Sequence, residues 1–211
     1  MHVARTHALT QGQSLSQITA RFAAQWGIAT RILPMSDQAL ATILVTDQGR
    51  LEFQRYFVEQ RCAPAVRHIM FEGATHAVPA PGVIEAIQSA DAVLLAPSNP
   101  FLSIDPLLAV PGIGSAIKQT KAPVIAVSPL VGGTAVKGPT AKLMQELSMA
   151  VDNDSIARHY AGLIDAILID NGDRCEAPDI VVGRCATLMT TPDDKIRVAQ
   201  AALDLAISFR S

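Results

Sequence analysis

Ala-Val-Leu-Leu-Ala-Pro-Ser-Asn-Pro-Phe-Leu-Ser, residues 92–103, is the stretch that decides the fold predicted for this chain. Its first five residues are apolar and uncharged, which is typical of a strand covered on both faces in a parallel sheet. Pro97 then ends the strand, and Ser98, Asn99 and Ser103 place hydroxyl and amide groups beyond it. Ligands of open α/β sheets bind outside the carboxyl ends of the strands. The stretch therefore predicts a binding edge.

A second stretch repeats this arrangement. The apolar strand candidate Pro123–Val127 precedes a turn that contains Gly132, Gly133 and Lys137. Two glycines allow backbone N–H groups to converge on an anion, and the lysine adds a positive charge. The turn is no P-loop, because its lysine precedes the last glycine. We predict that the two turns are two sides of one anion site; the structural alternatives are a simple turn and a flexible loop with a solvated lysine.

Strand and helix patterns alternate along the rest of the chain. We predict strands at Thr30–Leu33, Ala41–Thr46, Val66–Phe71, Ala92–Ala96, Ala166–Asp170 and Arg184–Leu188, and helices at Ser14–Gly27, Phe53–Arg61, Pro81–Ala90, Ile104–Val110, Ile113–Thr120, Thr140–Leu147, Ser155–Gly162 and Pro192–Ser208. A three-residue hairpin loop is expected at Asp47-Gln48-Gly49. In the last helix Ile196, Ala199, Leu203 and Ile207 recur on one face.

This alternation indicates an α/β fold, a Rossmann-like three-layer sandwich with a mainly parallel sheet and right-handed crossovers. We predict a single domain over residues 1–211, with a small hairpin-containing insert near residues 30–71.

Composition excludes several classes of protein. The formal net charge is −2 and no basic block is present, which argues against a nucleic-acid partner. No apolar run reaches the roughly 18 residues that a membrane span needs. Cys62, Cys175 and Cys185 lack metal or redox spacing, so a reduced cytoplasmic protein is expected.

Other chemical signals are weaker. Met35, Ser36 and Asp37 end a strand candidate and supply an acceptor for a hydroxyl group, although a simple turn also explains them. No histidine has a second ligand at metal spacing, and no Gly-x-Ser-x-Gly elbow occurs, which disfavours a zinc site and covalent catalysis. The residues alone thus predict an anion-binding edge for a phosphorylated small molecule.

Several strings of residues occur in a family-specific order. They are Leu33-Pro-Met-Ser-Asp, Phe53-Gln-Arg-Tyr-Phe-Val, Phe71-Glu-Gly-Ala, Pro79-Ala-Pro-Gly-Val, Ala96-Pro-Ser-Asn-Pro, Leu108-Ala-Val-Pro-Gly-Ile, Val127-Ser-Pro-Leu-Val-Gly-Gly, Val136-Lys-Gly-Pro, Arg158-His-Tyr-Ala-Gly-Leu-Ile-Asp and Thr187-Leu-Met. Together they span nearly all of the chain and resemble the 2-phospho-L-lactate transferase family, which makes the deazaflavin coenzyme F-420.

The resemblance implies transfer of a phospholactyl group, or a phosphoenolpyruvyl group in many bacteria, from a guanosine diphosphate-linked donor. The acceptor is the ribityl hydroxyl of a deazaflavin precursor, GMP leaves, and Mg²⁺ assists. We expect Ser98, Asn99 and Ser103 on one side of the donor phosphates and the turn with Gly132, Gly133 and Lys137 on the other. Residues 35–37 would lie on the acceptor side, and relatives suggest a homodimer.

Departures from the family pattern leave alternatives open. The family's first strand, glycine loop and Asp-rich segment would precede Met1, so we expect the catalytic residues and metal ligands outside this chain. Gln38 and Ala39 stand where many relatives carry Asp and Arg. The alternatives are a non-catalytic regulator that binds nucleotide sugars and an inactive fragment. The strings at Leu33–Asp37 and Phe53–Val58 argue against the regulator.

Overall fold

The main sheet of the molecule has four parallel strands. The computed structural model describes residues 2–136 and 138–210. The order of the strands is β4 (Val93–Leu95), β5 (Val124–Val127), β8 (Ala166–Asp170) and β9 (Val181–Cys185). Because each neighbouring pair is parallel, the carboxyl ends of all four strands lie at one edge.

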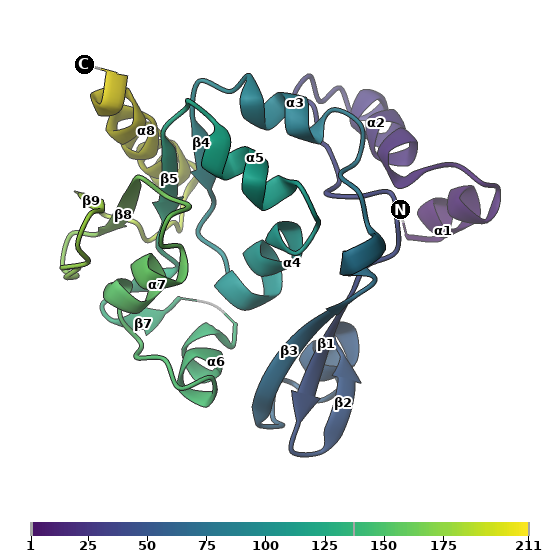
Figure 1. Cartoon of the computed structure of the whole chain (residues 1–211), viewed down its shortest axis with the longest axis horizontal. Helices are drawn as coiled ribbons and strands as arrows, with labels where there is room; N and C mark the ends of the chain where they lie inside the picture. The colour runs from purple at the N-terminus through teal and green to yellow at the C-terminus, as the bar shows by residue number, and fades with distance from the viewer. Residues whose placement is uncertain (1, 137, 211) are drawn as a thin grey trace.

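Helices cover both faces of this sheet (Figure 1). α8 (Pro192–Ile207) packs on one face, whereas α5 (Ile113–Gln119) and α7 (Asn153–His159) join the larger core on the other. Side chains alternate along β5, so Ile125 and Val127 contact the α8 side while the other two strand residues enter the larger core. The predicted three-layer α/β sandwich is confirmed.

A separate antiparallel sheet forms what we call the hairpin unit, residues 41–72, at the lower right of Figure 1. Its strands are β1 (Ala41–Thr46), β2 (Gly49–Glu52) and β3 (Val66–Glu72), in the order β2-β1-β3. The π-helix η1 (Arg55–Glu59) lies between β2 and β3. The hairpin loop has two residues and not the predicted three, because Gly49, with φ 104°, already pairs with Thr46.

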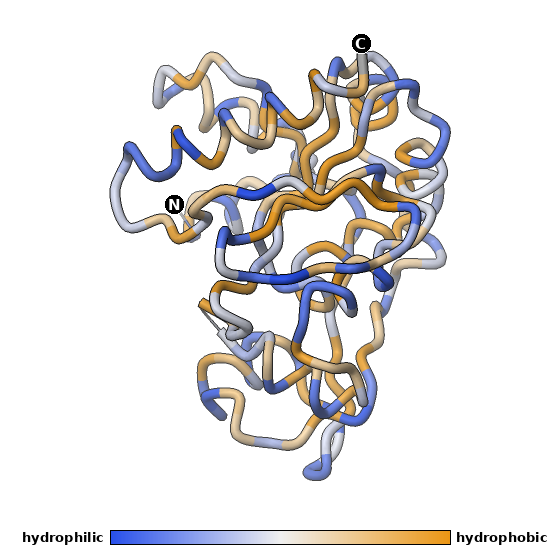
Figure 2. The backbone as a smooth tube through the Cα atoms, turned by 90° about the vertical axis from the view of Figure 1, so that its left-hand side faces the viewer, coloured by the Kyte–Doolittle hydropathy of each residue, from blue (hydrophilic) through white to orange (hydrophobic). Residues whose placement is uncertain are grey.

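The remaining elements are short. They are α1 (His2–Thr10), α2 (Leu15–Gln25), η2 (Ala74–His76), α3 (Val83–Gln88), η3 (Pro100–Ile104), α4 (Asp105–Leu108), β6 (Leu130–Val131), β7 (Thr134–Ala135), α6 (Thr140–Glu146) and η4 (Ser208–Arg210). Figure 2 shows long hydrophobic segments through the middle of the molecule, with hydrophilic segments beside them and in many of the outer bends. Among the described residues no single helix is long and apolar enough to cross a membrane. Only when Pro100–Leu108 and α5 are taken together do their length and composition suit a membrane span, and this pair is bent by 86°.

Three strand predictions need correction. Thr30–Leu33 forms no strand. β4 is not covered on both faces: it lies at the edge of the described sheet, where it pairs with β5, and Leu94 is 39% exposed. β9 ends at Cys185 and does not reach Leu188, because the backbone N–H of Thr187 is donated to the side chain of Asp170 instead of to a neighbouring strand.

The buried face of α8 also differs from the predicted one. Ile196 and Ile207 are 66% and 60% exposed. The helix instead buries Val198, Ala202 and Ala206. Small side chains allow close approach to the sheet, and a Cβ at Gly183 of β9 would lie 2.7 Å from Leu205.

Candidate functional site

A cavity of about 460 Å³ lies beyond the carboxyl edge of the parallel sheet. Its lining comes from the turns after β4, β5 and β9 and from the hairpin unit: Phe53, Phe57, Pro97, Ser98, Asn99, Leu102, Ser103, Ser128, Pro129, Val131, Val136, Gly138, Pro139, Thr140, Thr187, Leu188 and Met189. These residues offer hydroxyl, amide and apolar groups but no carboxylate. The cavity occupies the place where open α/β sheets bind their ligands.

The turn after β4 forms one wall of the cavity. The amide oxygen of Asn99 accepts the backbone N–H groups of Phe101 and Leu102, both at 3.0 Å, and so caps η3. Its nitrogen donates to Thr140 Oγ1 at 3.1 Å, across to the start of α6. Ser98 and Ser103 line the cavity and make no side-chain hydrogen bond to another described residue. Asn99 thus fixes this wall, and Ser98 and Ser103 contribute to it hydroxyls without a partner among the described residues.

The glycine-rich turn after β5 has a different role from the predicted one. Gly132 and Gly133, with φ 62° and 69°, connect β6 to β7 as a two-residue hairpin turn, and neither lines the cavity. Two consecutive positive φ angles are what a type I′ turn requires. The backbone N–H of Gly133 is donated to Asp173 Oδ1 at 3.1 Å. Lys137 lies outside the described residues.

A buried polar network anchors this glycine turn. The hydroxyl of Ser128 donates to Asn153 Oδ1 at 2.5 Å and accepts the N–H of Leu130 at 3.1 Å. Ser128 and Asn153 are each 2% exposed. The amide nitrogen of Asn153 lies 3.4 Å from Asp173 Oδ2, and Asp173 holds Gly133. Each buried polar side chain therefore has a partner, as interiors require.

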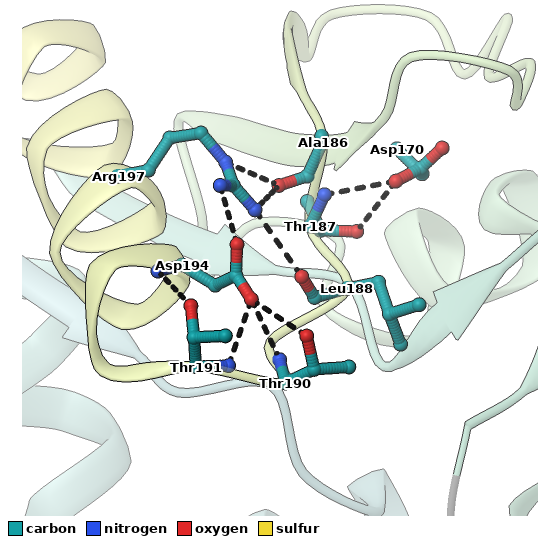
Figure 3. A network of polar contacts seen from close by, with 8 residues as sticks. All are labelled: Asp170, Ala186, Thr187, Leu188, Thr190, Thr191, Asp194 and Arg197. Atoms are coloured by element: carbon teal, nitrogen blue, oxygen red, sulfur yellow. Dashed lines mark hydrogen bonds and ion pairs between the residues drawn. The ribbon is translucent and has the colours of Figure 1, made fainter.

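The loop after β9 forms a third wall of the cavity. Figure 3 shows the polar contacts that hold this loop. Arg197 of α8 donates to the carbonyl oxygen of Leu188 at 3.2 Å and pairs with Asp194 at 2.6 Å. Thr187 donates its backbone N–H and its hydroxyl to Asp170 Oδ2, at 2.8 and 3.3 Å. These hydrogen bonds, the backbone one foremost, hold the pKa of Asp170 below its ordinary value. The loop is fixed from both sides.

The hairpin unit supplies the fourth wall through Phe53 and Phe57. Lys142 of α6 is not among the residues that line the cavity: its Nζ donates to the carbonyl oxygen of Pro64 at 2.8 Å and pairs with Glu146. Glu146 in turn accepts the N–H of Val66 at 3.0 Å. α6 thereby joins the hairpin unit to the hydroxyl side of the cavity.

The predicted acceptor-side residues are not among those that line this cavity. Asp37 accepts the backbone N–H and the hydroxyl of Ser16 at 2.7 and 2.8 Å, near the start of α2. Ser36 is buried and donates to Gln38. Met35 lines a second, apolar cavity of about 300 Å³ between α3, α5 and β4. Their place in acceptor binding stays a prediction.

The residues present do not fit a magnesium ion at the cavity. Mg²⁺ is usually held by one or two carboxylates together with substrate phosphates, and no carboxylate lines the cavity. Over residues 2–136 and 138–210, no three His, Cys, Asp or Glu side chains form a metal-binding group. Burial raises the pKa of the Cys62 and Cys185 thiols, which makes them poor nucleophiles.

Fold and site together define a class: a Rossmann-like α/β sandwich with a hydroxyl-lined cavity beyond the strand ends. The family model described as 2-phospho-L-lactate transferase CofD matches residues 1–183, and the chain belongs to this family of transferases. The recognition made from the ordered strings is confirmed.

Relatives with curated names support the same assignment. The chain is 38% identical over 220 residues to "Phosphoenolpyruvate transferase" of Streptomyces griseus, covering 100% of this chain and 69% of the relative. It is 33% identical over 204 residues to "2-phospho-L-lactate transferase" of Methanosarcina mazei, covering 94% and 67%. The chain thus spans about two thirds of the length of these relatives.

A solved structure supports the fold. The crystal structure of protein BH3568 from Bacillus halodurans, also described as a member of the UPF0052 family, superposes with a TM-score of 0.65 over 93% of this chain and 68% of that one. At 17% identity the likeness concerns the fold alone.

Proposed function

We propose that this chain acts in the transfer of a phosphoenolpyruvyl or phospholactyl group from a guanosine diphosphate-linked donor to the ribityl hydroxyl of a deazaflavin precursor, in biosynthesis of coenzyme F-420. The family match over residues 1–183 carries the proposal. The cavity beyond the strand ends supports it, because its unpaired hydroxyls suit the phosphate oxygens of a donor.

The protein assists such a transfer mainly by positioning the two substrates and stabilising charge, and it needs no covalent intermediate with the substrate. The hydroxyl oxygen of the acceptor bonds to the distal phosphorus while the bond from that phosphorus to the bridging oxygen breaks. GMP leaves with the bridging oxygen, and the hydroxyl proton passes to solvent. In this proposal Ser98 and Ser103 donate hydrogen bonds to donor phosphate oxygens, and Asn99 keeps the two walls of the cavity in place. Magnesium remains a prediction, and no step is assigned to it.

The direct test measures acceptor-dependent release of GMP. Purified protein is incubated with the guanosine diphosphate-linked donor, with and without the deazaflavin precursor, and products are quantified by liquid chromatography and mass spectrometry. We expect GMP and the transferred product only with both substrates. Firm GDP binding without any such release would contradict the proposal and favour a non-catalytic nucleotide-binding protein.

A further inference from the structure

Two stacked aromatic rings line the same cavity as the serine hydroxyl groups. Phe53 and Phe57 have ring centroids 5.4 Å apart and planes inclined by 29°. Phe53 is half-buried and packs against the main core, whereas Phe57 is 43% exposed. The chain has only six phenylalanines, and these two line one wall of the cavity beyond the strand ends.

The backbone that carries these rings is held firmly. Phe57 belongs to η1, a single turn of π-helix, and such turns occur frequently at functional sites. Tyr56, next to it in the chain, is fully buried, and its ring lies below the ammonium group of Lys142 at 5.8 Å. Lys142 also binds the carbonyl oxygen of Pro64. The aromatic wall is therefore fixed to α6, whose first residue is Thr140 of the hydroxyl wall.

The chemistry of the two walls points to an amphipathic ligand. The hydroxyls of Ser98 and Ser103 are free to donate to a polar or anionic group. In the same cavity, an apolar surface that covers the exposed ring of Phe57 lowers the free energy. A flat ring is the surface that stacks best on a phenylalanine face. A ligand with a flat ring at one end and phosphate or hydroxyl groups at the other satisfies both walls.

We propose that Phe53 and Phe57 form a stacking platform for the flat heteroaromatic ring of such a ligand. This proposal extends the proposed function and rests on it for the identity of the ring. Both the guanine of the donor and the deazaflavin of the acceptor are flat heteroaromatic rings. The platform itself is inferred from the two stacked rings and their place in the lining of the cavity. It makes these two residues determinants of ligand specificity.

The test compares ligands with and without a ring. Wild type, Phe57→Leu and Phe57→Trp are titrated calorimetrically with GDP, the deazaflavin precursor and inorganic pyrophosphate. We expect Phe57→Leu to weaken one of the two ring-bearing ligands roughly tenfold, because base stacking contributes about 1–3 kcal/mol. Phe57→Trp retains that affinity, and pyrophosphate affinity is unchanged. The ligand that loses affinity identifies the ring on the platform.

A matched control exists on α2. Phe22 and Trp26 form another stacked pair, with centroids 5.9 Å apart and planes inclined by 16°, away from the cavity. Phe22→Leu is expected to leave the affinity of every ligand unchanged. Equal loss in Phe22→Leu and Phe57→Leu would mean a general loss of stability, and would overturn the platform.

Two further probes separate this inference from the proposed function. Guanosine and riboflavin each carry a flat heteroaromatic ring and no phosphate. Both are tested at millimolar concentration by saturation-transfer NMR. We expect saturation of ring protons in wild type and its loss in Phe57→Leu. If Phe57→Leu binds GDP and the precursor with the affinities of wild type, the platform is overturned and the proposed function stands. Binding of guanosine or riboflavin through Phe57, without GMP release in the activity assay, retains the platform and removes the proposed function.

Discussion

The turns after β4 and β5 were both predicted to face one site, yet only Ser98, Asn99 and Ser103 of the first turn line the cavity, whereas Gly132 and Gly133 of the second do not. Ser98 and Ser103 of the first turn line the cavity with hydroxyls that have no partner among the described residues. Gly132 and Gly133 of the second turn make a hairpin, and the N–H of Gly133 is already donated to Asp173. A glycine-rich turn after a strand can therefore be a hairpin whose backbone donors are already paired within the protein.

The largest expected effect concerns the network below the second turn. Asn153→Ala leaves the hydroxyl of Ser128 without its buried acceptor, and we expect the free energy of unfolding to fall by about 2–3 kcal/mol. Chemical denaturation measures this loss. Asn171→Ala is the control, since Asn171 is exposed, and it should cost almost nothing. Equal stability of the two variants would mean that the network does not anchor the turn.

A methyl group at Gly132 tests the hairpin role. No atom lies within 4 Å of a Cβ built there, so the cost comes from the positive φ alone, and Gly132→Ala should lose about 1–2 kcal/mol of unfolding free energy. Gly172→Ala serves as the control, because its Cβ would meet only an ordinary contact at 3.9 Å from Asp170. If Gly132→Ala is as stable as its control in thermal unfolding, the turn does not need its left-handed backbone.

Two changes at Asn99 separate its two hydrogen-bonding roles. Asn99→Ala removes the cap of η3 and the bond to Thr140, and we expect a loss of about 1 kcal/mol. Asn99→Asp keeps an acceptor for the N–H groups of η3 but loses the donor to Thr140. It should therefore regain part of the stability in thermal unfolding. An unchanged melting temperature in Asn99→Ala would show that the first turn is held by other contacts.

The smallest effect is a dependence on pH at the third wall. Because the pKa of Asp170 is lowered in the folded state, its ionised form stabilises the protein above the ordinary value of 3.8, and this contribution disappears as the pH falls through the lower folded pKa. Asp170→Asn should thus melt below wild type at pH 7, and the difference should vanish in strong acid. A difference that persists there would show that the charge is not the cause.

Much of the fold could be predicted because local patterns agree with it. Ala41–Thr46 and Ala166–Asp170 are strands with the predicted bounds, since short apolar runs with β-branched residues favour strands. The capping box of Ser14 and Gln17 is present at the start of α2. The predicted face of α8 was wrong because the helix has apolar residues on two sides, and packing against Gly183 selected the smaller ones.

The location of the cavity at the strand ends could be predicted, but most of the residues that line it could not. The positions of Ser98, Asn99 and Ser103 follow from the end of one strand, whereas Thr140, Thr187 and Phe57 reach the cavity through long-range packing that no local pattern encodes. One signal was available and missed: Gly-Gly between two short strand candidates, Leu130-Val131 and Thr134-Ala135, is a hairpin turn signature. That signature would have assigned Gly132 and Gly133 to the β6–β7 turn.

GDP affinity of matched variants tests the central claim most directly. Wild type, the double variant Ser98→Ala, Ser103→Ala and the single variant Gly133→Ala are titrated with GDP by calorimetry, at temperatures where all remain folded. Lost hydrogen bonds to a charged phosphate should weaken GDP binding about tenfold or more in the double variant. Gly133→Ala should stay within about twofold of wild type, because its N–H is donated to Asp173 in the structure. A double variant that binds GDP like wild type, with Gly133→Ala weakened instead, would contradict the account.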